Sequence, residues 1–279
     1  ERPASLAVFN HAILYVPKHD LWLDGTAANS GSRDLPAEDR GASVLVVNPG
    51  GPARFTTIPE GRAEDNRSES RFDVALAEDG SAALRGEARV AGVEAPGWRR
   101  AYAAEGDRRQ ALEQALSRAF PGLAVREVAT SDLARLEEEV RLRFEAALPR
   151  LADRQEGGLW LPPFGGGQRM TETLAPLSAR RLDLVLGAPR ESRLAYRYTL
   201  PAGWRPAALP APVHLDGPYG RFEVSYRQDG GALVAEARTR LEAGRVPPAG
   251  YAAFRDFLSQ IDRALARPVR LVPGPTAAA

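Results

Sequence analysis

The stretch Phe72-Asp73-Val74-Ala75-Leu76 alternates in polarity, and after Glu78-Asp79-Gly80-Ser81 the alternation resumes in Leu84-Arg85-Gly86-Glu87-Ala88-Arg89-Val90. A two-residue period is typical of a strand with one buried face, and Asp-Gly favours a hairpin turn. The same spacing recurs in Phe222-x-Val224 and Asp229-Gly230, and Glu-Ala-Arg follows each Asp-Gly turn, at 87–89 and 236–238. The sequence therefore predicts β-hairpins, which are either two copies of a repeated unit or ordinary hairpins that converged on similar residues.

Two other stretches have helical spacing. Leu112, Leu116 and Phe120 precede Pro121-Gly122 and predict a helix over about 107–120. A second helix is predicted over about 249–266, after Pro247-Pro248, from the apolar stripe Tyr251, Phe254, Leu258, Ile261 and Leu265. Residues 139–147 are compatible with both periods, and we interpret them as a strand. The predicted fold class is therefore α+β, mainly β, with a β-sandwich-like region that carries two packed helices.

The cluster Asn48-Pro49-Gly50-Gly51-Pro52 is the best candidate for a domain boundary. It would divide the chain into residues 1–52 and a β-rich region, residues 53–279, that folds by itself. If the repeat is real, this region contains two related units, at about 53–130 and 190–279.

Composition excludes several classes of function. The 279 residues include 37 Lys plus Arg and 36 Asp plus Glu, so the net charge of +1 disfavours a nucleic-acid partner. No apolar run reaches the roughly 20 residues of a membrane span. The chain has no cysteine, which rules out disulfides and thiolate metal sites. Gly165-Gly166-Gly167 lacks the Lys-Ser/Thr of a phosphate loop. No cofactor or metal site is predicted.

His11 and Asp24 are the candidate catalytic residues. His11 lies in the alternating stretch 8–16, which predicts a strand. Leu21-Trp22-Leu23 returns as a second strand after a short turn, so a hairpin can place the two side chains together on neighbouring strands. A histidine acts as a general base when a carboxylate fixes its orientation. A single histidine in a strand is also often structural, so spacing alone leaves both interpretations open.

At these residues the sequence resembles the transglutaminase-like superfamily of papain-like cysteine enzymes. The matching motifs are Phe9-Asn10-His11-Ala12 and Trp22-Leu23-Asp24-Gly25-Thr26, with Gly25 where many relatives have proline. The resemblance implies that His11 is the base, that Asp24 orients it, and that residues 1–52 are the end of a catalytic core. The cysteine of the family would then lie before residue 1. We therefore expect the C-terminal part of a larger protein, inactive alone, whose residues 1–48 leave apolar strand faces uncovered.

Three functions are compatible with the sequence. The first is a cysteine acyltransferase or peptidase that acts on protein or peptide amides, completed by the missing cysteine-bearing part. The second is a non-catalytic β-rich binding or assembly module with a degenerate core. The third, a polysaccharide-binding sandwich, would need Trp98, Trp160 and Trp204 in an exposed row. The resemblance also implies a periplasmic or other extracytoplasmic location.

Overall fold

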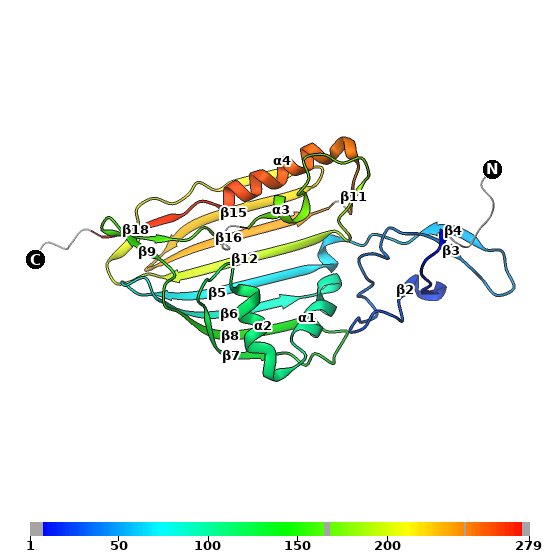
Figure 1. The fold of residues 1–279 in the computed structure, drawn as a ribbon, viewed down its shortest axis with the longest axis horizontal. Coiled ribbons are helices and arrows are strands. Elements are labelled where there is room, and N and C mark those ends of the chain that lie inside the picture. The colour runs from blue at the N-terminus through cyan, green and yellow to red at the C-terminus, as the bar shows by residue number, and fades with distance from the viewer. Residues whose placement is uncertain (1–7, 165–167, 243, 275–279) are drawn as a thin grey trace, which may run out of the picture.

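The computed structural model describes residues 8–164, 168–242 and 244–274, and its centre is one eight-stranded sheet. The strand order is β14-β15-β16-β12-β5-β6-β8-β7 (Figure 1). Its strands are β5 (Arg67–Leu76), β6 (Ala82–Val90), β7 (Ala124–Thr130), β8 (Val140–Leu148), β12 (Arg190–Thr199), β14 (Val213–Gly217), β15 (Gly220–Asp229) and β16 (Ala232–Leu241). The α+β, mainly β fold class is confirmed.

Both predicted hairpins are present and lie in this one sheet. β5 pairs with β6, and β15 pairs with β16, in each case antiparallel. They are joined through β12, which is antiparallel to β16 but parallel to β5, with Tyr196 opposite Phe72. Because a parallel pair needs a long crossover between its strands, residues 77–189 must form other elements before the chain returns.

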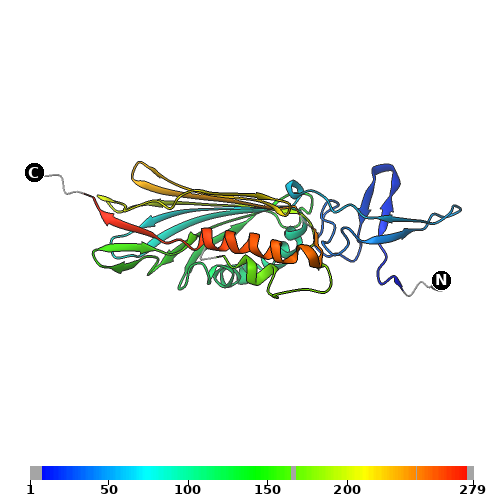
Figure 2. The ribbon, with the colours of Figure 1, turned by 90° about the horizontal axis from the view of Figure 1, so that it is seen from above.

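The helices and a small second sheet cover one face of the large sheet (Figures 1 and 2). The four-stranded sheet has the order β13-β18-β10-β9. Its strands are β9 (Asp153–Gln155), β10 (Gly158–Leu161), β13 (Trp204–Pro206) and β18 (Val269–Pro273). The helices are α1 (Ala95–Ala101), α2 (Arg108–Leu116), α3 (Met170–Leu174) and α4 (Pro248–Leu265). α2 and α4 confirm the two predicted helices. A two-strand pair, β11 (Leu184–Val185) with β17 (Arg245–Val246), lies before α4.

Aromatic side chains form a row across the covered face. Phe72 stacks on Tyr196 at 4.7 Å between ring centroids and meets the edge of Phe144 at 6.2 Å. Gly86 lies between Phe72 and Phe144 in the register, and a Cβ there would come within 2.1 Å of the Phe144 ring. Glycine is therefore required at this strand position, because the ring occupies the space of its missing side chain.

The opposite face of the sheet is open and charged. Residues 232–235 of β16 are all buried, whereas on β5, β6 and β8 the residues between the core positions are exposed or half-buried, as with Arg71, Asp73 and Arg85. This is the usual arrangement of an antiparallel sheet with one solvated face. Within the described ranges, no helix combines the length and apolar character that crossing a bilayer requires.

Residues 8–57 extend beyond one end of the large sheet (Figures 1 and 2). They contain two short hairpins: β1 (Leu14–Val16) with β2 (Leu21–Leu23), and β3 (Ser43–Val46) with β4 (Arg54–Thr57). Within residues 1–48, where uncovered apolar strand faces were expected, Val8, Leu14 and Val47 are exposed, although only Leu14 of these lies in a strand; Phe55 of β4 is exposed as well.

Two sequence predictions need correction in this part. His11 does not lie in a strand, since β1 begins at Leu14 and pairing ends at Leu14 opposite Leu23. The ladder stops there because Asp24 turns the chain by accepting the backbone N–H of Thr26. Residues 48–52 are the turn of the β3–β4 hairpin, so the division at residue 52 passes between paired strands. Independent folding of residues 53–279 stays a prediction.

A buried ion pair fastens the N-terminal part to the sheet. Arg99 of α1 donates to the Asp34 carboxylate at 2.8 Å and to the carbonyl of Asn29 at 2.8 Å. Its other terminal nitrogen donates to the carbonyls of Leu136 and Glu138, which precede β8. The side chains of Arg99 and Asp34 are only 2% and 9% exposed. This one guanidinium therefore joins segments that are far apart in sequence.

Candidate functional site

His11 and Asp24 come together beside the β1–β2 hairpin, as their spacing predicts. The distance from His11 Nε2 to Asp24 Oδ2 is 3.2 Å, and the His11 side chain is 38% exposed whereas that of Asp24 is 6% exposed. The residues stand just outside the ladder, His11 before β1 and Asp24 after β2. The hairpin thus holds a buried carboxylate against an accessible imidazole.

Thr26 fixes the Asp24 carboxylate. Its backbone N–H and its hydroxyl both donate to Asp24 Oδ1 at 2.8 Å. Burial by itself raises the pKa of Asp24, but the hydrogen bonds from Thr26 and from His11 outweigh it and lower the pKa below its usual value. The carboxylate is therefore ionised at neutral pH and is oriented to receive a proton-bearing imidazole nitrogen.

This geometry leaves Nδ1 as the His11 nitrogen that Asp24 does not engage. A ring with Nε2–H directed at a carboxylate carries its lone pair on Nδ1, which can accept a proton from a nucleophile. The dyad is thus equipped for general-base chemistry. The chain contains no cysteine to act as the nucleophile.

Asp39 is a third group at this site that the sequence did not reveal. It is 9% exposed, and among the described residues its buried Oδ2 has no hydrogen-bond partner. One nitrogen of His11 and one carboxylate oxygen each of Asp24 and Asp39 lie within 4.8 Å of one another. Burial raises the pKa of Asp39, and the negative charge of Asp24 raises it further. In sequence, Pro36-Ala37-Glu38-Asp39-Arg40 looks like an ordinary charged turn, so no local signal distinguishes Asp39.

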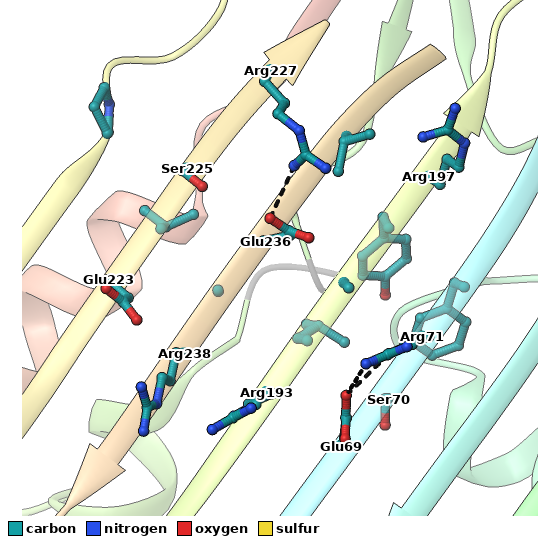
Figure 3. Close-up of a pocket in the computed structure, with 18 of the residues that line it drawn as sticks. Glu69, Ser70, Arg71, Arg193, Arg197, Glu223, Ser225, Arg227, Glu236 and Arg238 are labelled. Carbon is teal, nitrogen blue, oxygen red and sulfur yellow. Dashed lines mark hydrogen bonds and ion pairs between the residues drawn. The ribbon is translucent and has the colours of Figure 1, made fainter. Parts of the chain in front are cut away.

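The open sheet face carries a shallow groove of about 970 Å³ over β5, β12, β15 and β16 (Figure 3). Each arginine that lines the groove has an acidic partner. Arg71 contacts Glu69 at 2.6 Å and Arg227 contacts Glu236 at 2.9 Å within the groove, while the other three pair with acidic residues beside it: Arg193 and Arg238 with Glu191, and Arg197 with Asp229. Such pairs satisfy the arginines and leave little unbalanced charge for a ligand.

The three tryptophans of the polysaccharide hypothesis, Trp98, Trp160 and Trp204, are all partly buried rather than exposed. Trp98 of α1 packs against Tyr102 at 5.6 Å, and Trp160 of β10 lies under the guanidinium of Arg270 at 5.8 Å. Trp204 of β13 is half-buried against the main core. The polysaccharide hypothesis therefore has no support from their placement.

Comparison with known proteins gives a family match over part of the chain and a distant structural similarity. A family model described as a domain of unknown function with a solved structure, DUF3858, matches residues 159–271, which run from β10 to β18. One solved structure, described as "a putative protease" from Parabacteroides distasonis, is similar at 17% identity with a TM-score of 0.35. The similarity covers 42% of this chain and 24% of that one, so the chain spans a small part of the length of that protein. No curated protein sequence matches.

Proposed function

We propose that this chain is the C-terminal part of a transglutaminase-like cysteine acyltransferase or peptidase that acts on protein or peptide amides. In this proposal His11 is the general base and Asp24 orients it. The thiol nucleophile comes from a part of the protein outside this sequence, so the chain alone has no acyl-transfer activity. An extracytoplasmic location is proposed on the same resemblance.

The observation that carries the proposal is the His11–Asp24 contact of 3.2 Å, in which the carboxylate is buried and fixed by Thr26. A hydrogen bond between a base and an orienting carboxylate is the part of a nucleophilic triad that geometry can test. The residues around His11 and Asp24 also resemble the motifs of the transglutaminase-like superfamily, and this resemblance is the second support for the proposal. The exposed apolar residues Leu14 and Phe55 on the adjoining hairpins offer a surface for the remainder of such a core.

The test begins with the gene upstream of Glu1. The proposal expects the reading frame to continue into a segment that has a cysteine at the start of a helix. In the full-length protein, His11→Ala and Asp24→Asn should each slow both peptide-amide hydrolysis and alkylation of that cysteine by iodoacetamide. The loss should be at least about a hundredfold, as for removal of a general base. His19→Ala is the matched control, because His19 is exposed and lies outside the dyad.

Two results would refute the proposal. One is a reading frame that contains no upstream cysteine. The other is a full-length enzyme whose thiol reacts equally fast with and without His11, since a base that activates the thiol must change the thiolate population.

The second candidate is a non-catalytic binding or assembly module. The observation in its favour is the open face of the eight-stranded sheet with its groove (Figure 3). A reading frame that begins with a signal peptide directly before Glu1 would favour this function over the first.

A further inference from the structure

Three side chains from separate segments converge beside the β1–β2 hairpin. His11 precedes β1, Asp24 follows β2, and Asp39 comes from the loop that leads to β3. One donor atom of each lies within 4.8 Å of the other two. The set consists of one imidazole nitrogen and two carboxylate oxygens, which are donors that divalent transition metals accept.

Asp39 supplies an independent reason to expect an occupant at this site. Its Oδ2 is buried and, among the described residues, accepts no hydrogen bond. The next residue, Arg40, directs its guanidinium to the carbonyls of Leu35 and Arg33 at 3.1 and 3.3 Å. A buried carboxylate oxygen without a donor is expected to be paired with a cation or protonated.

We propose that His11, Asp24 and Asp39 form a binding site for one divalent transition-metal ion, with Zn²⁺ as the best match. Zinc accepts histidine nitrogen and carboxylate oxygen at about 2.0–2.2 Å, which requires two ligand atoms of one ion to lie within about 4.4 Å. The 4.8 Å limit of the cluster is close to this value, and the exposed His11 ring can move inward to close it. Solvent or a fourth ligand completes the coordination from the exposed side.

Metal binding is a second role for His11 and Asp24, and it does not depend on the proposed catalytic function. A bound ion would use an imidazole lone pair and the Asp24 carboxylate, which a general base needs free. The metal-loaded state would therefore be inactive in any amide chemistry that relies on His11. Zinc binding itself can be measured on this chain without the missing thiol, so the two proposals can fail separately.

The experiment is isothermal titration of Zn²⁺ into the purified 279-residue chain at pH 7 after treatment with a chelator. One equivalent should bind, and Asp39→Asn and His11→Gln should each weaken the affinity by at least about tenfold. Glu38→Gln is the matched control, since Glu38 is exposed and outside the cluster, and its effect should stay below about threefold. Co²⁺ should give visible absorption bands that Asp39→Asn abolishes.

Absence of saturable Zn²⁺ binding would overturn the proposal, as would equal affinity in wild type, Asp39→Asn and His11→Gln. Loss of binding in His19→Ala but not in His11→Gln would place the ion elsewhere and would also overturn it. His11→Gln keeps the test decisive if Asp39→Asn does not fold, because the exposed His11 side chain makes no contribution to the core.

Discussion

Asp34→Asn should destabilise the protein strongly although Asp34 lies outside the large sheet. The change keeps the shape of the side chain but removes the counter-charge of Arg99, whose guanidinium is 2% exposed. Breaking a buried ion pair from one side costs about 3–5 kcal/mol. Three backbone carbonyls, of Asn29, Leu136 and Glu138, still accept from Arg99, so we expect a smaller loss, about 2–4 kcal/mol.

Urea unfolding followed by far-ultraviolet circular dichroism measures this loss as a shift in the midpoint at constant slope. The matched control is Glu145→Gln, which breaks an exposed pair with Arg85 on the open sheet face and should cost no more than about 0.5 kcal/mol. Hydrogen exchange should show faster opening of residues 29–42 in Asp34→Asn than in the control. If Asp34→Asn is as stable as Glu145→Gln, the buried pair does not hold the N-terminal part in place.

Gly86→Ala should destabilise by about 1–3 kcal/mol, because the added Cβ collides with the Phe144 ring, and Gly86→Ala combined with Phe144→Leu should recover part of the loss in the same urea assay. Ile261→Val removes one methylene from a fully buried position of α4 and should cost about 0.5–1.5 kcal/mol; no loss would mean that α4 is loosely packed. The folded pKa of Asp24 lies below its unfolded value, so the contribution of Asp24 to stability is complete above about pH 4 and is lost as the pH falls through the folded pKa. Thr26→Val removes a hydroxyl that lowers this pKa, and thermal unfolding between pH 2 and 6 should show a smaller acid-dependent loss than in wild type.

Local periodicity accounts for the elements that were predicted correctly. The alternation at Phe72–Leu76 persists in β5 because every second residue enters the covered face. The stripe of α4 persists for the same reason, since Tyr251, Phe254, Leu258, Ile261 and Leu265 are all buried. The strand near His11 was predicted to be too long. Residues 8–13 have a high strand propensity, but they have no partner strand because the pairing ends at Leu14 opposite Leu23.

The proximity of His11 and Asp24 could be predicted because a short turn separates the segments that carry them. Asp39 could not, although it belongs to the same cluster, because its burial depends on a loop packed by contacts outside its own neighbourhood. Arg99 stands beside Arg100 in a short charged run with no local sign of burial, yet it is buried against Asp34. The burial of Arg99 can be recognised only from its contact with Asp34, which lies 65 positions away in the sequence.

The sequence by itself determined that the protein is mainly β, where the β5–β6 and β15–β16 hairpins and the longest helix lie, and that His11 and Asp24 can meet beside the first hairpin. These features depend on hydrophobic periodicity and on short loops, and both are determined by residues that are close together in the sequence. Only the tertiary structure decided that both hairpins join one sheet through the parallel pair β12–β5, that Asp39 is buried beside His11 and Asp24, and that Arg99 is buried. Each of these depends on contacts between distant segments, whose free energy no local pattern encodes.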